Sequence, residues 1–233
     1  MRQPVITSGI QPSGKLHLGN YFGALRQHIA LSKQHESYYF IVNYHALTTL
    51  NDAEALRQYT LDVARDYLAL GFDPDHPGTH LFVQSDVPEV TELAWIFLCL
   101  TPVSLLEKGV AYKDKVAQGL GANAGLFTYP ILQAADILIY GGELVPVGQD
   151  QKQNIEITRD LAQKFNAAFC PDDAPLFPMP DPLILEDVAV VPGLDGRKMS
   201  KSYNNTIGIF DEGKVLKSKV MSIVTDSTPL EAP

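Results

Sequence analysis

The first 84 residues alternate short apolar segments with longer segments of helical periodicity. Residues 4–8, 38–43 and 79–84 are short, apolar runs with β-branched or aromatic residues, which are typical of strands. Between these runs, apolar residues recur at helical spacing over Leu18–Ile29 and over Leu56–Leu70, with Asn51 and Glu54 resembling a capping box. Strands that alternate with helices indicate a parallel sheet. The sequence therefore predicts an α/β fold with a doubly wound parallel sheet.

Helical periodicity dominates the chain from residue 89 to residue 140, and we expect a helical insertion over about 88–125. Leu144–Val147 is typical of one more strand, and Asn154–Phe169 of an amphipathic helix. The proline-rich, acidic stretch 171–192 predicts an ordered connector with one buried strand at Val188–Val191. Basic residues outnumber acidic ones in the region that follows, so we expect a domain over 1–192 and a shorter region over 193–233.

Composition and charge exclude several classes of protein. The 233 residues are 45% hydrophobic and 19% charged, which is typical of a globular chain and not of a disordered one. The net charge of −9 argues against nucleic-acid binding by bulk positive charge. Two cysteines cannot form a disulfide framework or a four-sulfur metal site, and we find no targeting or membrane-spanning segment. We therefore expect a cytoplasmic protein that binds no membrane and has no metal-ligating side chains of its own.

The loop after the first strand is similar to a phosphate-binding loop. Gly9–Leu16 departs from the Walker A pattern at two points, because Leu16 supplies no hydroxyl for magnesium and Pro12 removes a backbone N–H. Glycines before a helix N-terminus still favour an anion, since unpaired N–H groups and the helix dipole attract phosphate. His17 and Asn20 lie one turn apart at this helix start, so both can reach the same ligand oxygens. A glycine- and proline-rich turn without a ligand is the alternative.

A second basic segment is Gly196–Ser202, which contains the pentapeptide Lys198–Ser202. Its two lysines, three residues apart, can neutralise charge that develops on a departing pyrophosphate. Its hydroxyls can complete a phosphate cradle when the loop closes. Taken alone, such a pentapeptide is as often a solvated surface loop.

Together and in this order, the two segments resemble the HIGH and KMSKS motifs of class I aminoacyl-tRNA synthetases. Further stretches look like bacterial tryptophanyl-tRNA synthetases, namely Ser8–Gly14, Gly19–Arg26, Val145–Gln153 with Thr158–Asp160, and Val224–Ser227. The resemblance covers essentially the whole chain and implies a Rossmann-like catalytic domain. It also implies a C-terminal helical domain that reads the anticodon, which we expect to be missing here.

The resemblance implies binding of ATP, with magnesium accompanying the nucleotide. Asp150 would accept hydrogen bonds from the ribose hydroxyls, and Val190 would lie beside the adenine. The catalytic residues it implies are His17, Lys115, Lys198 and Lys201. The ATP-binding residues it implies are Gln11, Pro12, Ser13, Gly19, Asn20, Gly148, Gln149, Asp150, Val190, Lys198, Met199, Ser200, Lys201 and Ser202.

Amino-acid selection would centre on the segment 129–136. On a helix, Tyr129, Gln133 and Asp136 share one face, so they can converge on one pocket. The resemblance implies that Asp136 accepts the indole N–H of tryptophan. A site built for such a polar partner rejects analogues that lack it by roughly 10⁴–10⁵. Tyr129 and Gln151 would bind the ammonium group, and His45 lies at the corresponding strand end.

Two features leave tyrosine open as the substrate. The pattern of Tyr129, Gln133 and Asp136 is that of tyrosyl-tRNA synthetases, and Asn43–Ala46 differs from the usual Asp-Gln-His-Ala. Gln133 could alternatively indicate a eukaryote-like tryptophan pocket. From other classes, a P-loop-type ATPase or kinase would use Gly9–Lys15. A non-catalytic synthetase paralogue would bind an amino acid or an adenylate for regulation.

The resemblance therefore implies activation of L-tryptophan with ATP and its transfer to tRNA(Trp), by a homodimer. No protein nucleophile is needed, so catalysis would come from positioning and charge stabilisation. Apolar residues of Glu89–Leu106 would form either the dimer interface or core. With the anticodon-reading domain missing, amino-acid activation is expected to be more efficient than tRNA charging.

Overall fold

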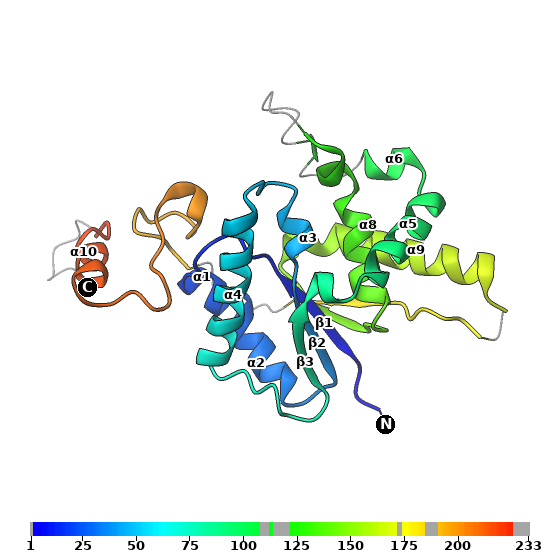
Figure 1. The fold of residues 1–233 in the computed structure, drawn as a ribbon, viewed down its shortest axis with the longest axis horizontal. Helices are drawn as coiled ribbons and strands as arrows, with labels where there is room; N and C mark the ends of the chain where they lie inside the picture. Colours follow the sequence, from blue (N-terminus) through cyan, green and yellow to red (C-terminus); the bar gives the residue numbers. More distant parts are fainter. Residues whose placement is uncertain (1, 108–111, 114–121, 172–173, 185–190, 226–233) are drawn as a thin grey trace, which may run out of the picture. The chain divides into compact units, whose positions relative to one another are not determined.

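The structure is a computed structural model (Figure 1), which describes residues 2–107, 112–113, 122–171, 174–184 and 191–225. The chain divides into two compact units. The first contains the described residues of 1–14 and 28–185, and the second contains those of 15–27 and 186–233. The second unit therefore combines an N-terminal segment with the C-terminal region of the chain.

A five-stranded parallel sheet forms the centre of the first unit, in the order β3-β2-β1-β4-β5 (Figure 1). Each strand pairs with its neighbours in parallel, and Ile6 on β1 lies opposite Ser37 on β2 and Leu144 on β4. This confirms the predicted doubly wound α/β fold. The direction in which successive strands are added to the sheet reverses between β1 and β4. In open α/β sheets, ligands bind at the loops that follow the strands at such a switch point. The strands are β1 (Ile6–Ile10), β2 (Ser37–Ile41), β3 (Thr79–Val83), β4 (Leu144–Pro146) and β5 (Asp181–Leu183).

Strand β5 differs from the sequence-based expectation. The expected strand Val188–Val191 falls largely outside the described residues, whereas β5 comprises Asp181, Pro182 and Leu183. Proline cannot donate to a ladder, so within sheets it is confined mainly to edge strands, and β5 lies at the edge. A three-residue edge strand with an aspartate and a proline carries no alternation by which a sequence pattern could reveal it.

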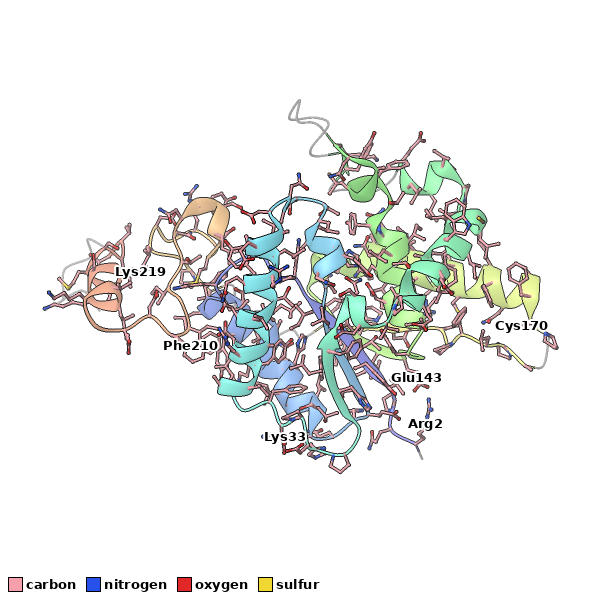
Figure 2. All side chains as sticks on the ribbon, viewed as in Figure 1. Arg2, Lys33, Glu143, Cys170, Phe210 and Lys219 are labelled. Atoms are coloured by element: carbon pink, nitrogen blue, oxygen red, sulfur yellow. The ribbon has the colours of Figure 1, made fainter. Side chains whose placement is uncertain are left out.

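The N-terminal end of the sheet is fixed by Arg2 and Glu143, which Figure 2 shows beside each other. Arg2 Nη2 lies 2.6 Å from Oε2 of Glu143, and the backbone N–H of Val5 donates to the same oxygen at 2.9 Å. The N–H of Glu143 in turn donates to the carbonyl of Val5 at 2.9 Å. These contacts join the segments that precede β1 and β4, so they hold the two strands in register.

Helices α5, α8 and α9 form one packed group in the first unit (Figure 1). Phe97 on α5, Ile131 on α8 and Leu161 on α9 are fully buried in their shared core. Apolar burial of this kind stabilises by about 25 cal/mol per Å². Helix α8 is thereby held firmly, and it carries three of the predicted site residues. Among the described residues, the helices that lie entirely in this unit are α3 (Asn43–Ala46), α4 (Ala53–Ala69), α5 (Glu89–Leu100), α6 (Val103–Leu106), α8 (Ala124–Leu138) and α9 (Lys152–Phe169).

Helix α4 corrects one prediction about its cap. Oδ1 of Asp52 accepts hydrogen bonds from the backbone N–H groups of Glu54 and Ala55, each at 3.0 Å. Asp52 is therefore the N-cap, and the expectation of Asn51 was wrong by one residue. Asparagine and aspartate cap helices about equally well, so residue type alone cannot choose between neighbours.

The helix expected after the first loop begins at Leu18 but is not uniform. It consists of α1 (Leu18–Asn20), a π-helical segment (Tyr21–Leu25) and α2 (Arg26–Ser32). Regular apolar spacing cannot distinguish a π-helical segment from a continuous α-helix, because both place recurring residues on one side.

His28 on α2 is buried in the first unit against two tyrosine rings. Its Nδ1 lies 2.7 Å from the hydroxyl of Tyr67, and its ring stacks on Tyr39 at a centroid distance of 4.7 Å. Burial lowers the pKa of His28 from 6.5 to about 3. The folded state therefore excludes a proton that the unfolded chain binds below pH 6.5.

The contribution of His28 to the free energy of unfolding should consequently be fully present above pH 6.5, and it should be lost progressively as the pH falls towards 3. His28 alone should remove about 2 kcal/mol between pH 7 and pH 5. Urea unfolding at the two pH values measures this loss. The variant His28→Asn keeps a polar group near Tyr67 but does not titrate, so its loss should be smaller by that amount. Equal pH dependence in the two proteins would contradict the assignment.

Candidate functional site

A buried carboxylate group lies at the centre of the first candidate cluster, within the first unit. Asp136 on α8 is only 2% exposed. Its Oδ2 lies 2.8 Å from Nε2 of His45, which α3 carries. The side-chain amide of Gln84 donates to both of its oxygens, at 2.7 Å to Oδ1 and 2.9 Å to Oδ2. Asp136 is thus a buried hydrogen-bond acceptor whose partners are the Gln84 amide and the His45 ring.

Gln84 is itself fixed by its surroundings. It is 1% exposed and begins the 3-10 turn Gln84–Asp86, directly after β3. Its Oε1 accepts from the backbone N–H of Tyr44 at 3.0 Å. Next to it, Asn43 donates to Oγ of Ser85 at 2.8 Å and accepts from the Ser85 N–H at 3.2 Å. These contacts tie the residues after β2 to those after β3, so the orientation of the Gln84 amide is determined.

A second polar cluster in this unit surrounds Asn154 on α9. Asn154 is 6% exposed, and its Nδ2 lies 3.0 Å from Oε1 of Gln133 and 2.9 Å from Oε1 of Gln151. The same nitrogen lies 3.4 Å from the hydroxyl of Tyr129. Three oxygens from three side chains therefore converge on one nitrogen. The ring of Tyr129 contacts that of His45 edge to face at 6.4 Å, which connects this cluster to the first.

The residues that are predicted to bind the amino-acid substrate thus lie in two adjacent groups. Tyr129, Gln133 and Gln151 share Asn154 as a partner, whereas Asp136 and His45 pair with each other. Sequence reasoning missed Gln84 and Asn154. A polar residue at the end of a predicted parallel strand was the available signal for Gln84. For Asn154, the signal was its position one helical turn after Gln151.

In the second unit, His17 is the N-cap residue of helix α1. Its backbone N–H donates to Oδ1 of Asn20 at 3.0 Å. Backbone hydrogen bonds of its neighbours, from Leu18 N to Ile207 O at 3.0 Å and from Ile209 N to Leu16 O at 3.2 Å, join this segment to 207–209. The two predicted motifs are thereby anchored in one unit.

The His17 imidazole lies against Gly19 and the Lys198–Ser202 loop. A Cβ at position 19 would lie 2.9 Å from Nδ1 of His17 and 3.5 Å from Cβ of Met199, so glycine is required by close packing. Burial, and secondly the positive charge of Lys201, lower the pKa of His17 from 6.5 to about 4. The imidazole is therefore neutral at pH 7. Its Nδ1 is buried, and among the described residues it has no hydrogen-bond partner.

The Lys198–Ser202 loop has a defined backbone in the same unit. Ser200 caps the 3-10 turn Lys201–Tyr203, with its Oγ accepting from the N–H of Ser202 at 3.3 Å. Lys198 forms an isolated antiparallel bridge with Pro192. The unit also contains α10 (Gly213–Met221), where Lys219 pairs with Asp211 at 2.6 Å.

The remaining predicted residues follow strands β1 and β4. Gln11, Pro12 and Ser13 form the loop after β1, where the N–H of Ser13 donates to the carbonyl of Gln11 at 2.9 Å. Gly148 caps the 3-10 turn Gln149–Gln151 after β4. The side chain of Asp150 and the whole of Lys115 and Val190 lie outside what the structure describes.

In the part of the chain that the structure describes, no group of three or more histidine, cysteine, aspartate or glutamate residues is arranged to hold a metal ion. Among the helices that the structure describes, none combines the length and apolarity needed to cross a bilayer.

Comparison with known proteins identifies the family. Residues 1–231 match the family model described as tRNA synthetases class I (W and Y). A tryptophan–tRNA ligase of Fusobacterium nucleatum is 57% identical over 226 residues, which cover 97% of this chain and 68% of that protein.

Solved structures give the same result. The tryptophanyl-tRNA synthetase of Campylobacter jejuni, crystallised with ADP and tryptophan, matches with a TM-score of 0.89 and 50% identity, over 98% of this chain and 70% of that one. The tryptophanyl-tRNA synthetase of Mycoplasma pneumoniae matches with a TM-score of 0.82 and 35% identity, over 96% and 66%. The chain belongs to the class I tRNA synthetases of the tryptophan and tyrosine group.

Proposed function

We propose that this chain is a tryptophanyl-tRNA synthetase, which activates L-tryptophan with ATP and transfers it to tRNA(Trp). The observation that carries the amino-acid site is the buried carboxylate group of Asp136, held by Gln84 and His45, which can accept from the side chain of the substrate. A carboxylate inside apolar surroundings is costly unless it is hydrogen-bonded, and an indole N–H is a donor of matching kind. The relatives at 50–57% identity are tryptophan enzymes, which supports the choice of tryptophan.

The proposed reaction has two steps. A carboxylate oxygen of tryptophan attacks the α-phosphorus of ATP, the bond to the bridging oxygen breaks, and pyrophosphate leaves with the electron pair. A ribose hydroxyl at the 3′ end of the tRNA then attacks the aminoacyl carbonyl, loses its proton, and displaces AMP. The protein contributes position and charge stabilisation, not a nucleophile.

The phosphates would be bound by the His17 and Lys198–Ser202 segments. At pH 7 the neutral imidazole of His17 can donate one hydrogen bond without adding charge. Lys198 and Lys201 supply positive charge where negative charge grows on the leaving pyrophosphate. Magnesium would be carried by phosphate oxygens, which are the hard ligands it prefers. Lys115, Asp150 and Val190 keep the roles that the family resemblance implies.

The ammonium group of tryptophan would be bound by Tyr129, Gln133 and Gln151. Their oxygens converge on the Nδ2 of Asn154, and such an arrangement of acceptors also suits a group with three N–H donors. Gln133 thus belongs with the ammonium-binding residues and does not contact the side-chain acceptor, Asp136. That placement fits the tryptophan and the tyrosine alternatives alike, so the choice of tryptophan rests on the relatives at 50–57% identity, which are tryptophan enzymes.

A homodimer and a cytoplasmic location complete the proposal. Trp95 on α5 is 67% exposed and Val103 on α6 is 62% exposed. The buried face of α5 carries Phe97 instead, so the exposed face supplies apolar surface that a second subunit could cover.

Pyrophosphate exchange into ATP, measured with tryptophan and with tyrosine, tests this function. Tryptophan should support exchange with a kcat/KM about 100-fold higher than that of tyrosine, because both side chains offer Asp136 a donor and the pocket discriminates by the shape of the ring. Equal exchange with both amino acids would contradict the proposed choice of tryptophan. ATP hydrolysis that needs no amino acid would instead favour the P-loop alternative.

A further inference from the structure

Asn205 lies three residues after the Lys198–Ser202 loop, yet it is buried to 2% exposure. Resting on the proposed function, we propose that Asn205 is a positioning residue, whose side-chain amide clamps the loop so that Lys198 and Lys201 are aimed at the phosphates. The clamp lies wholly within the second unit.

The amide uses both of its ends. Its Oδ1 accepts from the backbone N–H of Ser200 at 2.8 Å. Its Nδ2 donates to the backbone carbonyl of Lys198 at 3.2 Å and to Oδ1 of Asp195 at 2.6 Å. One side chain therefore fixes the peptide groups on both sides of Met199, in the middle of the loop.

Asn205 is itself held in place by its own backbone and by close packing against Gly193. The backbone carbonyl of Asn205 accepts from the N–H of Leu194 at 2.9 Å. A Cβ at Gly193 would collide with the Asn205 amide, so the backbone approaches the amide as closely as only glycine allows. Hydrogen bonds from Asn205, and then from Arg197, lower the pKa of Asp195 to about 2, so this acceptor stays ionised at neutral pH.

Arg197 connects Asp195 to Tyr203, at the far end of the loop. Its Nη2 pairs with Oδ2 of Asp195 at 2.6 Å, and its guanidinium lies 4.4 Å above the ring of Tyr203. The turn Lys201–Tyr203 is thus held at its end by Tyr203 and at its start by Ser200. Since Lys201 lies between these two points, its backbone direction follows from the clamp.

The kinetic test uses the full chain and two substitutions. Asn205→Ala removes every side-chain contact. Asn205→Asp keeps the acceptor for Ser200 but loses the donor and places a second carboxylate against Asp195. Both should lower kcat of pyrophosphate exchange about 100-fold, because misplacing a catalytic group by about 1 Å has this effect. The KM for tryptophan should stay within about twofold, since only transition-state stabilisation is lost.

Asn204→Gly is the matched control. Asn204 is the exposed neighbour and has a positive φ of 51°, which glycine adopts without strain. This variant should keep kcat within about twofold of the wild type. Loss of kcat in Asn204→Gly equal to that in Asn205→Ala would overturn the specific role of Asn205.

Limited trypsin digestion gives a readout that needs no activity. Arg197, Lys198 and Lys201 are cleavage sites in or beside the loop, and Lys33 (Figure 2) is an exposed internal reference in the first unit. Asn205→Ala should accelerate cleavage in the loop about tenfold, as expected when its hydrogen bonds no longer oppose local opening. Cleavage at Lys33 should not change. A general acceleration, or none, would overturn the clamp.

The two proposals fail in different ways. A wild-type chain that shows no tryptophan-dependent exchange would overturn the proposed function. An active wild type whose Asn205→Ala variant has unchanged kcat would overturn this inference alone.

Discussion

Replacement of Asp136 by asparagine is expected to lower kcat/KM for tryptophan-dependent exchange by about 10³-fold. Both carboxylate oxygens of Asp136 accept from N–H groups, from Gln84 on both and from His45 on Oδ2. Asparagine replaces one of these acceptors with a donor, so donor faces donor on at least one side. Gln84 cannot simply turn its amide over, because its Oε1 already accepts from Tyr44 N at 3.0 Å.

The KM for ATP separates this role from general damage. It should change by less than about threefold in Asp136→Asn, because the phosphate-binding residues are on other elements. Asp160→Asn is the control on α9, where the aspartate pairs with Lys164 at 2.7 Å on a partly exposed surface. Gln84→Met, which keeps the shape of the side chain without its amide, should lose activity in the same direction but less. Retention of kcat/KM in Asp136→Asn within about threefold would refute the assignment.

Replacement of Lys201 by alanine is expected to lower kcat of pyrophosphate exchange by about 10²–10³-fold, with little change in the KM for tryptophan. Lys201 begins the turn that Ser200 caps, and its charge contributes to the lowered pKa of His17. In the proposed mechanism, its positive charge acts on negative charge that develops only as pyrophosphate leaves. The loss should therefore be seen in kcat.

Lys33→Ala is the control for Lys201→Ala, since Lys33 is an exposed lysine outside both candidate clusters. The variant Lys201→Ala should also raise the pKa of His17 from about 4, because one of its two causes is removed. NMR titration of the histidine ring measures that pKa independently of turnover. An unchanged exchange rate in Lys201→Ala would show that the lysine has no role in the chemistry.

Much of the fold follows from periodicity, and the exceptions have physical causes. Strands β1 to β4 are mostly buried or half-buried and lie in segments rich in apolar residues, so their sequences indicate them directly. Edge strand β5 contains Pro182 and has no such pattern. The choice between Asn51 and Asp52 as a cap depends on backbone geometry that residue type does not encode.

The candidate site was predictable where motifs carry the information. His17, Asp136 and Lys201 were predicted from motif resemblance. Gln84, which binds Asp136, and Asn154, which contacts the neighbouring polar cluster, belong to no such motif. Such supporting contacts depend on tertiary packing, and a single sequence gives no measure of which strand ends meet. The structure was needed to show that one asparagine joins Tyr129, Gln133 and Gln151.

The discontinuous second unit has a consequence for synthesis on the ribosome. Its residues 15–27 are made early, but their backbone partners at 207–209 are made after the whole first unit. At ordinary elongation rates this is a delay of roughly ten to forty seconds. Contacts between residues so far apart in sequence also form slowly, because the entropy cost of closing the loop precedes the free energy that the contacts contribute. We therefore expect the nascent chain to complete its amino-acid pocket first and to acquire its proposed phosphate-binding segments later, so that the ability to consume ATP arrives only after residues 207–209 have been made.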